Sequence, residues 1–178
     1  QSILGRPRAT DSGPVGGPTG GPAYSGNTVP EKGTADVTTD PSRAKDYFLE
    51  TRSMRLPILY PTTFESSSEF EEVRQYQIAH RDGNRSVVED AYRLVAETSG
   101  GDYWGLQGTS WANPPILEDP TREARRGGRT YKLYFNGTKL HMVAWSQGTG
   151  TYWISNSPLN NLSNETMLAI ADGVKPLE

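Results

Sequence analysis

The chain has 178 residues, 34% hydrophobic side chains, no cysteine and a formal net charge of -3. The lack of cysteine excludes disulfides, thiolate metal sites and cysteine nucleophiles, and the acidic balance argues against general nucleic-acid binding, which depends on basic patches. No apolar run approaches the ~20 residues of a membrane-spanning helix, and no signal peptide is evident. The chain begins at Gln1, so we expect a piece of a longer protein whose membrane anchor, if it has one, lies upstream.

Residues 1–40 differ in composition from the remainder. They hold eight glycines and five prolines but hardly any large apolar side chains, so they cannot bury enough surface to offset the entropy lost on ordering. Low-complexity repeats of Gly-Gly-Pro occur without the three-residue period of collagen. We therefore predict a disordered linker or tail over residues 1–40 and a single domain over 41–178.

Two short elements open the predicted domain. Asp40 and Pro41 are typical of a helix N-cap and first helical position, which predicts a helix over residues 41–52. Its buried face would carry Ala44, Tyr47, Phe48 and Thr51. Residues 56–61 form an apolar run between prolines, which favours an edge strand.

A hairpin is predicted next. Residues 72–80 alternate between apolar and polar side chains, and residues 81–84 have turn chemistry. The return limb, residues 85–97, has two interpretations. Ser86 and Glu89 match a capping box that would begin a helix, whereas the alternation after Ala91 is typical of a strand leading into an aromatic strand over residues 102–107.

Residues 129–157 predict three consecutive antiparallel strands. A type I′ turn at Asn136-Gly137 would pair Leu133 with Leu140 and Tyr131 with Met142 on one dry face.

The next turn, around residues 146–150, leaves the side-chain parity open. A loop of four residues would place Trp153 on the dry face, whereas a loop of five would place Tyr152 and Ile154 there.

The remaining segments complete the predicted architecture. Prolines restrict residues 111–120 to an extended, ordered loop. Ser163 is a helix cap, and a terminal helix would bury the stripe of Met167, Ile170, Ala171 and Val174 before ending near Gly173. The predicted fold class is α+β, with an N-terminal and a C-terminal helix packed on an antiparallel, meander-rich sheet.

Motifs of catalysis are weak in this sequence. Ser110 lies in a run that approaches the G-x-S-x-G nucleophile elbow but ends in alanine, and Ser42 with Lys45 matches S-x-x-K without its companion motifs. The two histidines, His80 and His141, are too few for a metal site, which needs three or four convergent ligands. We expect no metal and no cofactor.

Carboxylates near aromatic residues are the remaining catalytic option. Glu118, Asp119 and Asp102 could form the pair that a glycosidase requires, but loop solvation is the more economical interpretation. Four N-glycosylation sequons, at Asn84, Asn136, Asn161 and Asn164, would matter only in a eukaryotic secretory protein.

Two groups of residues suggest binding. Aromatic rings with adjacent amides can hold sugar faces, and the glycan-binding candidates are Tyr103, Trp104, Gln107, Trp111, Tyr134 and Trp145. Clustered arginines suit phosphate groups, and the phosphate-binding candidates are Arg122, Arg125, Arg126 and Arg129, with Lys132 nearby. Core packing of the rings and an exposed loop for the arginines are the alternatives.

The C-terminal two thirds of the chain resemble a known family. Five segments, residues 102–117, 128–134, 143–145, 152–156 and 162–171, are similar to the C-terminal region of certain actinobacterial LytR-CpsA-Psr proteins, and the resemblance covers roughly residues 55–177. In those relatives the segment matching residues 91–97 also alternates, which favours the strand interpretation of residues 85–97.

The resemblance implies a function for a parent protein. LytR-CpsA-Psr proteins are membrane-anchored and extracytoplasmic, and their catalytic domain transfers glycopolymers from a polyprenyl-pyrophosphate carrier to peptidoglycan. Nothing in this sequence matches that catalytic domain, so no catalytic residue carries over. We expect a noncatalytic, cell-envelope accessory module whose partners are wall glycopolymer or peptidoglycan and its own upstream catalytic domain. A free-standing carbohydrate-binding domain and a small hydrolase using the carboxylates near Trp111 are the alternatives.

Overall fold

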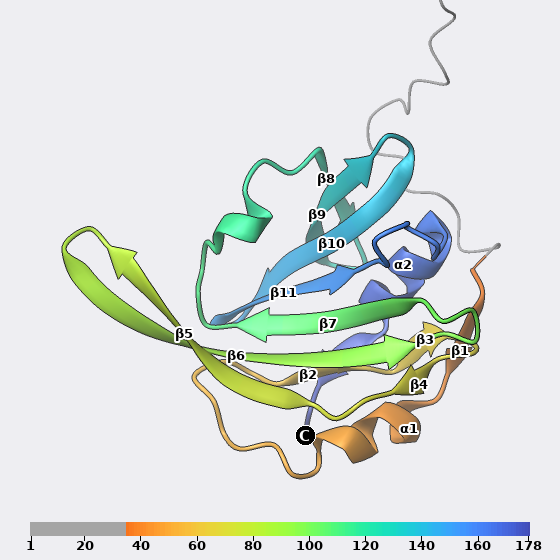
Figure 1. Ribbon diagram of the computed structural model, residues 1–178, viewed down its shortest axis with the longest axis horizontal. Coiled ribbons are helices and arrows are strands. Elements are labelled where there is room, and N and C mark those ends of the chain that lie inside the picture. Colours follow the sequence, from red (N-terminus) through yellow and green to blue (C-terminus); the bar gives the residue numbers. More distant parts are fainter. Residues whose placement is uncertain (1–34) are drawn as a thin grey trace, which may run out of the picture.

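A computed structural model describes residues 35–178, and its main feature is one antiparallel sheet of eight strands (Figure 1). The strand order is β4-β6-β7-β11-β10-β9-β8, with β5 also paired to β6. In chain order the elements are β1 (Val37–Thr39), α1 (Pro41–Lys45), the 3-10 helix η2 (Asp46–Phe48), β2 (Leu59–Pro61), β3 (Thr63–Glu65), β4 (Glu69–Phe70), β5 (Arg74–Asp82), β6 (Arg85–Glu97), β7 (Tyr103–Thr109), the 3-10 helix η3 (Pro115–Leu117), β8 (Arg122–Arg126), β9 (Arg129–Asn136), β10 (Lys139–Gln147), β11 (Gly150–Ser155), α2 (Asn164–Asp172) and β12 (Val174–Pro176).

One face of the sheet, here the covered face, carries the core. The two helices and the small sheets β1-β3 and β2-β12 lie against it (Figure 1). The opposite side, here the outer face, is partly open and has a smaller apolar cluster of Leu117, Tyr134, Met142, Ala144 and Trp153. No helix within residues 35–178 combines the length and apolar character needed to cross a membrane.

Fully buried tyrosines tie the covered core to the start of β2 and to the segment just before it. The Tyr92 hydroxyl donates to the Leu59 carbonyl at 2.7 Å and accepts from the Leu59 amide at 2.9 Å. The Tyr152 hydroxyl donates to the Pro57 carbonyl. Burial raises the pKa of both phenols, so each remains a neutral hydrogen-bond donor.

The structure confirms the predicted α+β class in its broad form: an antiparallel sheet with two short helices. The predicted tail boundary was too late, because Val37–Thr39 pair with Thr63–Glu65 as strands β1 and β3; residues 1–34 lie outside the described residues. The N-cap at Asp40 is confirmed, since its carboxylate accepts from Ser42 and Arg43 amides.

The N-terminal helix is shorter than the predicted range 41–52. It ends at Lys45 and continues as η2 to Phe48, where the Thr51 amide and hydroxyl both donate to the Phe48 carbonyl. A threonine side chain that competes for a backbone carbonyl favours helix termination. Ala44 and Phe48 are buried as expected, whereas Tyr47 is 41% exposed.

The open question over residues 85–97 is decided in favour of a strand. Strand β6 pairs with β5 along its first half and with β7 along its second half, so it carries the sheet from the projecting β5-β6 hairpin to the core (Figure 1).

The three predicted strands over residues 129–157 are confirmed, but the register of the first hairpin was wrong. Asn136 pairs with Lys139, so the turn lies at Gly137 and Thr138, and the pairing then shifts between Leu140 and Met142. Met142 is therefore opposite Tyr134, not Tyr131, and it faces outward.

The cause of this shift is a bulge held from outside the hairpin. The Leu140 amide donates to Asn164 Oδ1 at 2.8 Å, and the His141 carbonyl accepts from the Asn156 amide at 2.8 Å. Both bonds reach beyond the β9-β10 hairpin, to the residue that follows β11 and to the start of α2. An extra residue in one strand reverses the alternation of side chains.

The second hairpin has a shorter turn than either predicted loop. Gln147 pairs with Gly150, so the turn has two residues. This register places Tyr152 and Ile154 in the covered core and Trp153 on the outer face.

The C-terminal helix forms as predicted from its cap at Ser163, but it ends at Asp172. Val174, predicted in the helical stripe, lies instead in β12 opposite Pro61.

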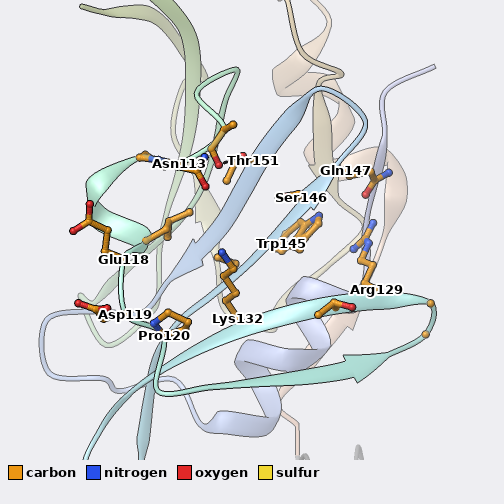
Figure 2. Close-up of a pocket in the computed structure, with 17 residues that line it drawn as sticks. Asn113, Glu118, Asp119, Pro120, Arg129, Lys132, Trp145, Ser146, Gln147 and Thr151 are labelled. Atoms are coloured by element: carbon orange, nitrogen blue, oxygen red, sulfur yellow. Dashed lines mark hydrogen bonds between the residues drawn. The ribbon is translucent and has the colours of Figure 1, made fainter. Parts of the chain in front are cut away.

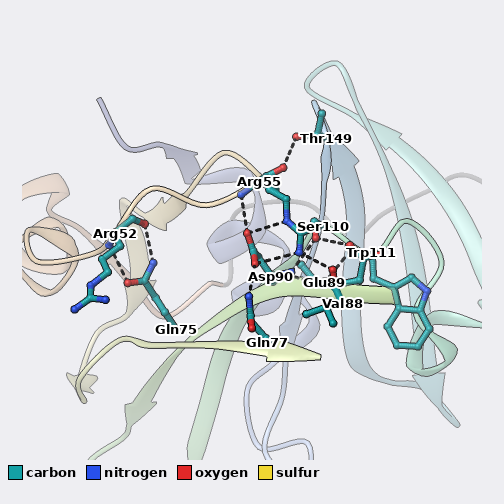
Figure 3. A network of polar contacts seen from close by, with 11 residues as sticks. Arg52, Arg55, Gln75, Gln77, Val88, Glu89, Asp90, Ser110, Trp111 and Thr149 are labelled. Atoms are coloured by element: carbon teal, nitrogen blue, oxygen red, sulfur yellow. Dashed lines mark hydrogen bonds and ion pairs between the residues drawn. The ribbon is translucent and has the colours of Figure 1, made fainter. Parts of the chain in front are cut away.

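A polar network holds the segment before β2 against the base of the β5-β6 hairpin (Figure 3). The Arg55 backbone amide and side chain both donate to the Asp90 carboxylate, at 2.9 to 3.3 Å, and the Arg55 side chain also reaches the Val88 carbonyl at 2.5 Å. The Asp90 side chain is only 15% exposed. Hydrogen bonds from Arg55 lower the pKa of Asp90 below its usual value.

This network predicts a specific response to acid. Because the Asp90 pKa is lower in the folded chain, its stabilising effect is complete above the unfolded value, near 4, and is lost as pH falls through the folded value. Asp90→Asn should therefore lower the free energy of unfolding at pH 7 and weaken its dependence on pH below about 4. Urea titrations across pH measure both, and Asp82→Asn at the exposed hairpin turn is the control. Equal acid sensitivity of Asp90→Asn and the native chain would contradict this role.

Candidate functional site

The main cleft arises where strands β9 and β10 separate. Their pairing ends at Lys132 opposite Ala144, although β9 stays paired with β8 as far as Arg129 and β10 stays paired with β11 as far as Gln147. Figure 2 shows β10 running apart from β8 and β9 beyond this point. Strand edges that carry no ladder bonds offer backbone donors and acceptors to a ligand.

The proline-rich loop after β7 forms the second wall of this cleft. It is fastened to the sheet by the Tyr134 hydroxyl, which donates to the Leu117 carbonyl at 2.6 Å, and by the Thr151 hydroxyl, which donates to the Ala112 carbonyl at 3.3 Å. Prolines and η3 stiffen the loop between these points. The wall is therefore held in place before any ligand arrives.

The cleft has a volume of about 800 Å³, within the usual range for small-ligand sites. Its lining is mixed, with carboxylates on the loop side and cations on the β9 side (Figure 2). The polar side chains that line it are Asn113, Glu118, Asp119, Arg129, Thr130, Lys132, Ser146, Gln147 and Thr151. Asp119 has a positive φ of 52°, a conformation that aspartate tolerates better than most residues.

Two residues that line the cleft each contain a buried polar atom with no hydrogen-bond partner in the described part of the chain. These atoms are the indole nitrogen of Trp145, a residue only 2% exposed, and Oε1 of Gln147. In Figure 2 the Trp145 nitrogen lies on the side of the ring nearest Gln147 and Arg129. A buried donor and a buried acceptor without partners are costly, and a ligand group that accepts from one and donates to the other would satisfy both.

Three of the predicted glycan-binding residues are buried. Trp104 lies in the covered core, where its nitrogen donates to Ser68 Oγ at 2.8 Å. Tyr134 holds the loop through Leu117, and burial raises the pKa of its phenol. Trp145, the third, lines the cleft through the gap between strands.

The other three glycan-binding candidates lie apart on the outer face. Tyr103 is 44% exposed at the far end of β7, and Gln107 is half-buried in the middle of that strand. Trp111 stacks on His80 with ring centroids 3.8 Å apart. The six candidates therefore do not form one surface.

The predicted phosphate-binding arginines lie on a hairpin, not in an exposed loop, because residues 122–126 form β8 and Arg129 begins β9. Arg129 donates to the Ala171 and Val174 carbonyls at 2.8 and 2.6 Å, and Arg126 pairs with Asp172 at 2.7 Å. Both hold the C-terminal end of α2, where cations are favourable.

Tyr131 joins the same group, since its hydroxyl donates to Asp172 at 3.2 Å and burial raises its pKa to about 12. Arg122 lies over the Phe135 ring at 4.7 Å. Arg125 is exposed and points to the outer face, opposite Thr130. The four arginines thus do not converge on one point.

The catalytic options find little geometric support. Ser110 Oγ donates to Glu89 at 2.6 Å, and His80 contacts the other oxygen of Glu89 at 3.4 Å, so the carboxylate separates the hydroxyl from the imidazole that would activate it. Among the described residues no group of three or more histidine, aspartate or glutamate side chains could hold a metal ion.

The carboxylates of the hydrolase hypothesis are also separated. Glu118 and Asp119 are consecutive on one wall of the cleft. Asp102 lies just before β7, and the six steps from Tyr103 to Thr109, where the loop begins, span about 20 Å.

Sequence reasoning missed Gln147, Asn113, Ser146 and Thr151 as cleft residues. Gln147 precedes a Gly-Thr-Gly run and is indistinguishable in sequence from an ordinary residue beside a turn. Comparisons with known proteins give no further assignment: no family model matches the chain, and neither curated proteins nor solved structures yield a significant match.

Proposed function

We propose that this domain is a noncatalytic glycan-binding module that acts through the cleft between β9 and β10. The observation that carries the proposal is that two residues lining the same cleft, Trp145 and Gln147, each hold a buried donor or acceptor without a partner among residues 35–178. A sugar hydroxyl both accepts and donates a hydrogen bond, so one hydroxyl can satisfy the two atoms together. Further hydroxyls would bind the free strand edges and the polar loop side chains.

The resemblance of residues 55–177 to the C-terminal region of LytR-CpsA-Psr proteins extends the proposal to a parent. There the module would hold peptidoglycan or wall glycopolymer near an upstream transferase domain, outside the cytoplasm. The mixed lining supports a largely neutral saccharide, because Glu118 and Asp119 on one wall offset Arg129 and Lys132 on the other.

The test is the binding of soluble, phosphate-free peptidoglycan fragments, measured by NMR and by calorimetry. Gln147→Met should weaken binding about tenfold, the value of one hydrogen bond to a buried acceptor. Its stability should be unchanged or higher, because Gln147 Oε1 has no hydrogen-bond partner to lose among the residues that the structure describes.

The matched control is Gln107→Met, the same substitution on the outer face at a residue that does not line the cleft. It should leave the affinity unchanged. NMR shifts that centre on Tyr103 or Trp111 and spare Gln147 would mean that the fragments bind outside the cleft, and would contradict this site. Cleavage of the fragments by the purified chain would contradict the noncatalytic assignment.

A further inference from the structure

Two arginines face each other on the outer surface of strands β5 and β6. Arg74 is the direct cross-strand partner of Arg93, and both side chains are exposed. Within the described part of the chain neither guanidinium makes an ion pair or a hydrogen bond. Directly opposite residues have Cα atoms about 5 Å apart, and like charges at that position are destabilising.

The surroundings of this pair form a shallow hollow. Its volume is about 650 Å³, and Tyr76 and Val73 line it together with the two arginines. Tyr76 is 38% exposed. Glu72 also lines it but does not pair with either arginine within 4 Å.

The hollow lies on the same face of the sheet as the cleft. Arg93 is opposite Gln107, Gln107 is opposite Trp153, and Trp153 is opposite Ala144. Ala144 is in turn opposite Lys132 in the cleft. Four strand spacings separate Arg93 from Lys132, or about 19 Å, which one extended polymer can span.

We infer that Arg74 and Arg93 form an anion site that binds a phosphate group, in particular a phosphodiester of an anionic wall polymer. Two arginines at directly opposite positions of neighbouring strands, both lining one hollow, can present several N–H donors in the fork geometry that suits phosphate oxygens. A bound anion would also remove the repulsion between the two cations. The phosphate site is independent of the cleft, whereas the polymer as its source rests on the proposed function.

The first experiment titrates the 178-residue chain with inorganic phosphate and follows backbone and arginine side-chain NMR signals. Shifts should centre on residues 72–76 and on Arg93. Arg93→Gln should weaken binding about tenfold, and Glu72→Gln should tighten it about threefold. Arg85→Gln, at an exposed arginine of the hairpin turn, is the control and should change nothing.

A second measurement separates a binding role from a structural one. Without phosphate, Arg93→Gln should raise the melting temperature by about 1–3 °C, because it removes like-charge repulsion. If Arg93 instead stabilised the fold, Arg93→Gln would lower the melting temperature. A lower melting temperature, or phosphate shifts spread over Arg125 and other exposed cations, would overturn the inference.

The ligand source is tested with three further probes. A glycerol-phosphate oligomer should bind more tightly than inorganic phosphate, in an Arg93-dependent way, and a phosphate-free glycan fragment should shift the cleft alone. Phosphate binding without glycan binding supports the anion site and refutes the glycan function. Glycan binding without phosphate binding refutes the anion site and supports the glycan function. Arg93-dependent binding to vesicles of anionic lipid, with none to the oligomer, would overturn the polymer assignment.

Discussion

Asn156→Ala is expected to lower the free energy of unfolding by about 4 kcal/mol, because one buried side chain satisfies four backbone groups. Its Nδ2 donates to the carbonyls of Leu140 and Leu162 at 3.0 and 2.9 Å, and its Oδ1 accepts from the amides of Ser157 and Leu162 at 2.8 and 3.1 Å. Alanine would leave these groups buried without partners. Urea denaturation measures the loss, which corresponds to roughly 10 °C in melting temperature.

The control is Asn161→Ala, an exposed asparagine in the same loop. It should change the free energy of unfolding by less than about 0.5 kcal/mol. A similar small effect for Asn156→Ala would mean that water replaces the carboxamide, and that the loop does not fasten β10 to the start of α2.

Gly108→Ala should destabilise the fold by about 3 kcal/mol, through overpacking of the covered core. A Cβ at this position would lie 2.5 Å from Tyr92 Cε1 and 2.9 Å from two ring atoms of Tyr152. Neither ring can move easily, since both hydroxyls are bound to the backbone of residues 57 and 59. Chemical denaturation followed by tryptophan fluorescence measures the change.

Gly100→Ala provides the matched comparison. Its added Cβ would have its nearest neighbour at an ordinary 3.5 Å, and alanine at a position that tolerates it restricts the unfolded chain. Its stability should therefore be equal or slightly higher. Equal stability of the Gly108→Ala protein would show that the tyrosine rings shift, contrary to the packing described for the core.

The two binding proposals use opposite parts of the outer face and different chemistry. The cleft combines unpartnered, uncharged groups with balanced charges, whereas Arg74 and Arg93 present two cations in the open. Salt should distinguish them, because interactions between exposed charges are screened at high ionic strength and hydrogen bonds to buried groups are not.

The structure shows why the site was harder to predict than the strands. Trp145 is recognisable in sequence as a strand residue, but its place in the lining of a cleft depends on where β9 and β10 stop pairing. From the sequence, Arg126 and Arg129 could each bind a ligand. In the fold, Arg126 pairs with Asp172 and Arg129 donates to the Ala171 carbonyl, both in α2. Asn164, the first residue of α2, accepts a hydrogen bond from the Leu140 amide next to the register shift in β10, a contact that no local sequence pattern indicates.

The sequence by itself determined the local elements: the alternating strands, the cap residues Asp40 and Ser163, and the antiparallel order around the turns. These follow from the alternation of side chains along a strand and from the preference of particular residues for cap and turn conformations, which involve only a few neighbouring residues. Only the tertiary fold decided the bulge at His141, the face that Met142 occupies and the gap between β9 and β10 beside Trp145. Each of these depends on hydrogen bonds between residues distant in the chain, and local pattern carries no information about such partners.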